Sequence, residues 1–162
     1  MGEEGVRLGG VVGLISDTHG LMRDEAVEAL RGSELIIHAG DVGRPEILDR
    51  LRQIAPVVAI RGNIDTGPWA EALPETALAN VAGVRIYVLH DVKQLGRAAG
   101  FDVVVSGHSH QPLEERRGGI LYVNPGSAGP RRFRLPITVA RLDLRTKPWR
   151  VEFVPLLPVT SP

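Results

Sequence analysis

Groups that could bind a metal cation follow three successive predicted strands in the first half of the chain. They are Asp17 and His19 after residues 11–15, Asp41 after residues 34–38, and Asn63 with Asp65 after residues 57–60. Taken singly, each could be a helix cap or an ordinary turn residue. Helix capping explains a polar residue at one strand end easily, but less easily at three. The carboxyl ends of neighbouring parallel strands meet at one edge of a sheet, so these residues would lie close together. The pattern therefore predicts a site for a hard or borderline cation.

Histidines mark the ends of two further predicted strands. His90 closes the run 84–90, and the motif Gly107-His108-Ser109-His110 follows the apolar run 102–106. Two histidines two residues apart in a turn can face one site, and the glycine permits close approach of the backbone. Because the chain has no cysteine, any metal must be bound by histidine, carboxylate, amide or water ligands.

Two other polar features receive a structural interpretation. His38 lies inside the buried strand 34–38, so we interpret it as a core or supporting residue and not as a ligand. The segment Asn124-Pro125-Gly126-Ser127 reads as a loop between strands, and Pro and Gly are the usual residues of such turns.

The elements that would position these groups alternate between strand and helix in the first half. The apolar runs 11–15, 34–38 and 57–60 are typical of strands covered on both faces, and helical periodicity appears at 22–31 and 44–53. This order implies parallel strands joined by right-handed crossovers.

The second half is richer in strands. Its predicted elements are strands at 76–81, 84–90, 102–106, 112–116, 120–124, 137–144 and 149–154, with a short helix at about 92–99. We therefore expect an α/β fold, a four-layer αββα sandwich in which two mixed sheets are flanked by helices. One domain is expected over residues 1–162, with its core at about 11–157.

Composition narrows the class of protein. Lys plus Arg and Asp plus Glu number 19 each, and the sequence pI is near 7.0, so the basic surface of a nucleic-acid polymer binder is not expected. No run of about 18 apolar residues predicts a membrane span, and the first residues lack the apolar segment of a signal peptide. We expect a cytoplasmic protein, with a homo-oligomer left open.

The ordered set D-x-H, GD, GN-x-D, H, GHSH and NPGS resembles the calcineurin-like metallophosphoesterases. More narrowly, it is similar to the small bacterial and archaeal phosphodiesterases to which the retromer subunit fold is related, and the resemblance runs from about residue 11 to residue 157. It implies a binuclear metal centre bridged by Asp41. The implied ligands are Asp17, His19, Asp41 and His110 for one metal, and Asp41, Asn63, His90 and His108 for the other. Mn is our first expectation for both ions, with Ni, Fe, Co or Zn as alternatives.

The resemblance implies a phosphodiesterase that acts on a small phosphate ester, in which a hydroxide shared by two metals attacks phosphorus in line. Asn63 is expected to orient the phosphate as well as bind metal, and Asp65 to fix the tautomer of a ligand histidine. The alternatives are a phosphomonoesterase or nucleotide pyrophosphohydrolase using the same metals, and a non-catalytic scaffold of the same fold.

The chain departs from the family pattern near the expected centre. Ile64 stands where many members have a histidine beside the leaving group, and Asp91 follows His90 where many have glycine. The stretch between His90 and His108 is also shorter than usual. Isoleucine cannot give the leaving group the proton that this histidine can supply, and the shorter stretch implies a trimmed helix and a more open site.

Overall fold

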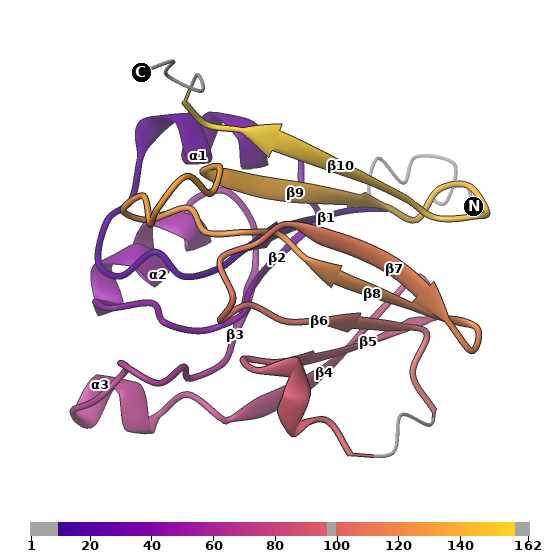
Figure 1. Ribbon diagram of the computed structural model, residues 1–162, viewed down its shortest axis with the longest axis horizontal. Helices are drawn as coiled ribbons and strands as arrows, with labels where there is room; N and C mark the ends of the chain where they lie inside the picture. The colour runs from indigo at the N-terminus through magenta and orange to yellow at the C-terminus, as the bar shows by residue number, and fades with distance from the viewer. Residues whose placement is uncertain (1–9, 97–99, 158–162) are drawn as a thin grey trace.

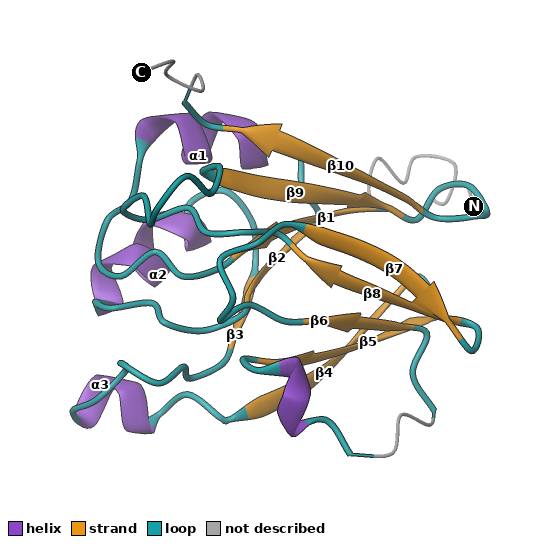
Figure 2. Ribbon diagram, in the orientation of Figure 1, coloured by secondary structure: helices purple, strands orange, loops and turns teal. Residues whose placement is uncertain are grey.

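The computed structural model describes residues 10–96 and 100–157 of the chain. In this part, two five-stranded sheets pack face to face (Figure 1). The strand order is β10-β9-β1-β2-β3 in the first sheet and β4-β5-β6-β8-β7 in the second. Figure 2 shows that strands dominate the molecule and that its helices are few and short. Both sheets are mixed, as the sequence predicts.

The first sheet is built around three parallel strands. They are β1 (Val11–Ile15), β2 (Leu35–His38) and β3 (Val57–Ala59), joined by helices α1 (Asp24–Leu30) and α2 (Pro45–Arg52). β9 (Thr138–Asp143) pairs antiparallel with β1, and β10 (Arg150–Pro155) pairs antiparallel with β9. The carboxyl ends of β1, β2 and β3 therefore lie side by side at one edge.

The second sheet has a parallel centre between two hairpins. β5 (Val84–Leu89), β6 (Val103–Val105) and β8 (Ile120–Asn124) run parallel. β4 (Thr76–Val81) pairs antiparallel with β5, and β7 (Leu113–Arg117) with β8. A single helical turn, α3 (Pro68–Glu71), stands between β3 and β4 and was not predicted.

Three apolar clusters define the layers. One lies between the sheets and joins residues such as Leu14 and Ile37 of the first sheet to Ile86 and Val105 of the second. A second lies between the first sheet and helices α1 and α2, and a third covers the outer face of the second sheet. This arrangement confirms the sandwich fold.

The fourth layer is thinner than the sequence suggests. In place of a helix at about 92–99, the described residues form one 3₁₀ turn, η2 (Val92–Gln94), after which Leu95 returns to extended backbone. Residues 97–99 lie outside the described part. Asp91 caps the turn by accepting a hydrogen bond from Lys93 N (3.0 Å), and Gly96 follows Leu95, so helix propagation is disfavoured there.

Among the described residues, no helix has the length and apolar composition needed to cross a bilayer.

Candidate metal centre

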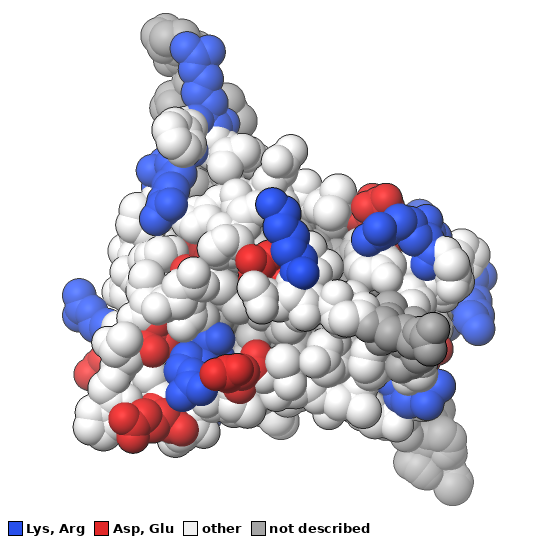
Figure 3. Space-filling model, turned by 60° about the horizontal axis from the view of Figure 1, so that its bottom comes forward, with Lys and Arg blue, Asp and Glu red and all other residues white. Residues whose placement is uncertain are grey.

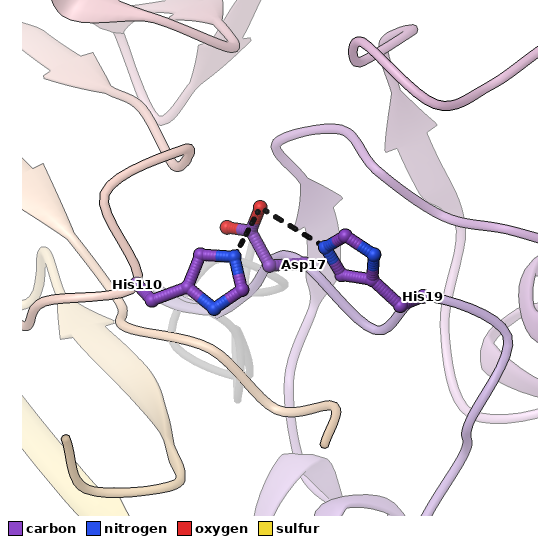
Figure 4. A group of neighbouring side chains, drawn as sticks. All are labelled: Asp17, His19 and His110. Carbon is purple, nitrogen blue, oxygen red and sulfur yellow. Dashed lines mark ion pairs between the residues drawn. The ribbon is translucent and has the colours of Figure 1, made fainter. Parts of the chain in front are cut away.

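The turns that follow β1, β2, β5 and β6 bring five predicted ligands together. Asp17, His19 and His110 form one group and Asp17, Asp41 and His90 form another, with the candidate ligand atoms of each group within 4.8 Å of one another. Figure 4 shows the first group, in which both imidazole rings turn toward the Asp17 carboxylate. Asp17 belongs to both groups, so it lies at the middle of the cluster.

The two oxygens of Asp17 have different surroundings. Oδ2 accepts hydrogen bonds from Ser16 Oγ (2.7 Å) and from the backbone N–H of His108 (3.1 Å). Oδ1 is buried without a hydrogen-bond partner in the described structure, 3.5 Å from His110 Nε2 and 3.9 Å from His19 Nε2. The protein thus fixes one oxygen with its own donors and leaves the other for a cation.

The two oxygens of Asp41 also have different surroundings. Oδ1 accepts from the backbone N–H of Ile64 (3.0 Å), while Oδ2 lies 3.5 Å from His19 Nε2 and 3.3 Å from His90 Nε2. One oxygen therefore faces ring nitrogens from both groups. That position is compatible with the predicted bridge, and the bridge itself remains a prediction.

A backbone contact sets the tautomer of His90. Its Nδ1 lies 2.7 Å from the carbonyl oxygen of Ala39, which can only accept, so Nδ1 carries the proton. The unprotonated Nε2 then points at Asp17 Oδ1 (3.8 Å) and Asp41 Oδ2 (3.3 Å). A histidine held in this way by its second nitrogen is the usual arrangement in metal sites.

Protonation equilibria in the cluster reflect burial and mutual charge. Burial raises the pKa of Asp17 to about 6, against the hydrogen bond from Ser16. Burial also acts to raise the pKa of Asp41, but His90, when its ring is protonated, and the hydrogen bond from Ile64 N outweigh it and hold that pKa at about 2. Burial, aided by the charge of Arg132, lowers the pKa of His110 to about 4. Neutral histidine beside carboxylate is the donor set that borderline divalent cations take.

Unsatisfied buried atoms provide a test of whether this donor set fits a cation. Four buried side-chain atoms have no hydrogen-bond partner within the described residues, namely Asp17 Oδ1, His19 Nε2, His90 Nε2 and His110 Nδ1. Burying such groups unpaired is costly, and all four belong to predicted ligands. The residues present therefore fit a divalent metal.

Two other predicted ligands, Asn63 and His108, are exposed at the rim, and His108 belongs to neither compact group of histidines and carboxylates. The side chain of His108 is 43% exposed, and its ring stands edge-on to that of His90 with centroids 5.1 Å apart. Its Nε2 lies 3.8 Å from Asp91 Oδ2. That Asn63 and His108 bind metal therefore remains a proposal.

Asp65 has a different role from the expected one. Its carboxylate accepts hydrogen bonds from the backbone N–H groups of Gly62 (2.8 Å), Gly43 (2.9 Å) and Val42 (3.1 Å). The ligand histidine whose tautomer is set, His90, is held by Ala39 instead. The expectation that Asp65 orients a ligand histidine is therefore wrong, because the loop folds back and uses the carboxylate to join the turns after β2 and β3.

Sequence reasoning missed several residues that support the ligands. Asn124 Nδ2 donates to the Gly107 carbonyl (2.9 Å) and to Ser109 Oγ (3.1 Å), so the loop after β8 holds the histidine-bearing turn. Gly107, in contrast, allows the close approach that the sequence predicts, since a Cβ there would lie 2.0 Å from Ser16 Oγ. The available sequence signal for such support was Ser16 and Thr18, which flank Asp17, because short hydroxyl side chains often form hydrogen bonds with nearby backbone.

The backbone at the ligands is unusual in conformation. Asp17, His19, Asp41, His108 and His110 have φ of 56°, 48°, 58°, 73° and 65°. All five stand in the left-handed region, which glycine favours and other residues enter infrequently. Each turn thereby projects its side chain back toward the cluster from a strand end.

Comparison with known proteins agrees with this geometry. Residues 11–147 match the calcineurin-like phosphoesterase superfamily domain. The chain belongs to this superfamily. It is a metal-dependent phosphoric ester hydrolase, as the resemblance of its motifs implies, and its relatives are named as a probable metallophosphoesterase and a phosphodiesterase.

Among curated proteins, this metallophosphoesterase is 36% identical over 151 residues to a probable metallophosphoesterase of Methanothermobacter thermautotrophicus, covering 82% of this chain and 86% of the relative. It is 28% identical over 158 residues to the phosphodiesterase YfcE of Escherichia coli K12, covering 79% and 84%.

Solved structures share the fold. The phosphoesterase YfcE of Escherichia coli superposes with a TM-score of 0.67 at 26% identity, covering 82% of this chain and 88% of that one. Chaetomium thermophilum Vps29 superposes with a TM-score of 0.72 at 19% identity, covering 89% and 96%, a likeness that concerns the fold alone.

Proposed function

We propose that this metallophosphoesterase is a phosphodiesterase that uses two divalent cations, with Mn preferred. The observation that carries the proposal is the convergence of Asp17 Oδ1 and Asp41 Oδ2 with ring nitrogens of His19, His90 and His110 at separations of 3.3–3.9 Å. Asn63 and His108 complete the proposed set from the rim. The naming of YfcE as a phosphodiesterase supports the choice of a diester substrate.

Bound divalent cations lower the pKa of a coordinated water to roughly 7 and offset charge on the phosphoryl oxygens. The chain's own contribution is to hold the ligands before a cation arrives. Ser16 and the His108 N–H fix Asp17, Ala39 fixes His90, and the Ile64 N–H fixes Asp41. Asn63, exposed beside the cluster, is proposed to orient the phosphate.

Arg132 adds positive potential on one side of the centre. After burial, its charge is the next cause that lowers the pKa of His110, and it also lowers that of His19, against the opposing effect of Asp41, so its field reaches the ligand atoms. A phosphodiester carries one negative charge, and positive potential at its site favours its approach.

Charges of both signs are interspersed on the face seen in Figure 3, where basic side chains stand in separate groups, several beside acidic ones. This distribution suits a small ester better than a long polyanion.

A metal-by-substrate screen tests the proposal. Protein freed of metal by chelation and dialysis is reloaded with Mn, Ni or Mg, and each form is given bis(4-nitrophenyl) phosphate, 4-nitrophenyl phosphate and a nucleoside diphosphate. We expect the diester to be hydrolysed fastest, Mn and Ni to surpass Mg, and chelation to abolish the reaction. Faster cleavage of the monoester or the diphosphate would replace the diesterase assignment, and full activity in excess chelator would refute the metal centre.

A further inference from the structure

A cavity of about 440 Å³ adjoins the metal centre on the side of His90. It lies between the loop after β3, the start of β4, the end of β5 and the turn η2. Two predicted ligands, Asn63 and His90, form part of its wall. Its volume falls within the range of roughly 300–1,000 Å³ typical of small-molecule sites. An ester bound at the centre would therefore have room here for one of its organic groups.

The wall combines apolar surface with hydrogen-bonding groups. Leu89 and Tyr87 supply the apolar part, and the Tyr87 ring is held by stacking on Phe101 with centroids 4.4 Å apart. Thr76 and Gln94 supply a hydroxyl and an amide, each able both to donate and to accept. Such a lining suits a group that carries hydroxyls on a compact carbon frame.

Charge on the wall disfavours a second anion. The cavity is lined by the carboxylates of Glu75 and Asp91 and by the guanidinium of Arg61. Arg61 Nη2 already donates to Glu75 Oε2 at 3.1 Å, so its charge is partly engaged. Among the described lining residues, negative groups thus outnumber positive ones, and a further phosphate on the bound group would meet repulsion.

We propose that this cavity is the subsite for a neutral, hydroxyl-bearing ester group, such as a glyceryl or ribosyl group, of the substrate. The proposal rests on the phosphodiesterase function above and adds its substrate class. Glu75 accepts hydrogen bonds from the hydroxyls, and Gln94 donates to them or accepts from them. Tyr87 and Leu89 pack against the carbon frame.

Three diesters that share one leaving group test the subsite. They join 4-nitrophenyl phosphate to a glyceryl, an ethyl or a 2-phosphoethyl group, so the departing nitrophenolate is the same in each. We expect kcat/KM for the glyceryl ester to exceed that for the ethyl ester by roughly fivefold to tenfold, since one or two net hydrogen bonds are gained, with most of the difference in KM. The phosphoethyl ester is expected to be the poorest substrate.

A matched pair of variants assigns the effect to the cavity. Glu75→Gln removes the carboxylate of an exposed Arg–Glu pair at the cavity mouth, and Glu115→Gln removes one from a similar pair with Arg117 (3.3 Å) on the edge strand β7. We expect Glu75→Gln to reduce the glyceryl preference and to raise the relative rate of the phosphoethyl ester, and Glu115→Gln to leave both ratios at the wild-type value. A wild-type ratio near one, or a ratio unchanged in Glu75→Gln, would overturn the subsite.

A binding measurement separates this proposal from the proposed function. In NMR titrations of the metal-free and metal-loaded protein, glycerol 3-phosphate should shift the side-chain amide signals of Gln94, and inorganic phosphate should not. If none of the three diesters is hydrolysed with any metal, the phosphodiesterase assignment fails, and the Gln94 signals still decide whether the cavity binds the glyceryl group. Unmoved Gln94 signals at saturating glycerol 3-phosphate would refute the subsite even in an active enzyme.

Discussion

His38 Nε2 lies 3.0 Å from Thr18 Oγ1, the hydroxyl that stands between the predicted ligands Asp17 and His19. The Gly40 N–H donates to His38 Nδ1 (3.1 Å), so the ring proton is on Nε2 and is donated to Thr18. Thr18 in turn donates to the Val42 carbonyl (2.8 Å). This buried chain of hydrogen bonds joins the turns after β1 and β2 without touching the metal groups.

Substituting His38 by glutamine should affect stability more than metal binding. His38 is fully buried, and glutamine can reproduce only part of its donor and acceptor geometry. We expect His38→Gln to lower the free energy of unfolding by about 1–3 kcal/mol, with metal content close to that of the wild type. Urea unfolding and elemental analysis measure the two quantities. A fall in metal stoichiometry at an unchanged melting temperature would place His38 in the metal site instead.

The same residue should give the protein a dependence of stability on pH. Burial lowers the pKa of His38 to about 4, against about 6.5 in the unfolded chain. Between these values the unfolded state binds the proton more tightly, so the contribution of His38 is full above pH 6.5 and is lost as pH falls through 4. Unfolding measured from pH 8 to pH 4 should show a smaller decline in His38→Gln than in the wild type. Parallel curves would contradict the prediction.

Asp41 should be the most sensitive of the proposed ligands. Asp41→Asn keeps the volume but removes the charge that faces both His19 and His90. We expect loss of at least one bound metal and a rate reduced on the order of a hundredfold or more. Asp49→Asn, which alters an exposed carboxylate on α2, is the control. Two metals retained at a near-normal rate would refute a bridging role.

Metal affinity should depend on pH near neutrality. Burial raises the pKa of Asp17 to about 6, so below that value a proton competes with the cation for the carboxylate. Burial acts to lower the pKa of His90, but the Asp41 carboxylate and the Ala39 carbonyl favour its protonated form and raise that pKa, which adds a second competing proton. Titrations with Mn between pH 5 and pH 8 should therefore show affinity falling steeply below about pH 6, with a shallower dependence on pH above 6 where His90 still competes. An affinity that is flat from pH 5 to pH 7 would contradict this assignment.

Position 64 offers a test of leaving-group chemistry. Ile64 is 44% exposed beside the cluster and has no proton to give to a departing alkoxide, help that is typically worth about a hundredfold to ten-thousandfold. We expect the rate of the wild type to fall steeply as the pKa of the leaving group rises, and Ile64→His to flatten that slope.

The measurement at position 64 is a series of aryl and alkyl phosphodiesters, with Ile64→Gln as a polar control that transfers no proton at neutral pH. Parallel slopes for wild type and Ile64→His would show that another group protonates the leaving oxygen. In that case Ile64 only shapes the site.

The sheets could be predicted because their strands are continuous apolar runs, and β1 and β6 are fully buried as such runs imply. The turn α3 could not be predicted, because four residues are too few to show a helical periodicity. The role of Asp65 was also out of reach, because the sequence places it in the same turn as Asn63. Only the fold shows that its carboxylate turns back to three backbone N–H groups. Sequence spacing locates a group along a strand end, whereas its orientation depends on contacts between distant loops.

The left-handed backbone at the predicted ligands has a thermodynamic consequence. A residue with a Cβ in that region costs the folded state about 1–2 kcal/mol relative to a relaxed conformation, and glycine avoids this penalty. His19, at φ 48°, and His110, at φ 65°, are therefore positions where replacement by glycine relaxes the chain as it removes a proposed ligand. Stability and metal binding oppose each other at these residues. The metal-free wild type is therefore less stable than its fold allows, and a glycine variant that no longer binds metal can have a larger free energy of unfolding than the metal-free wild type.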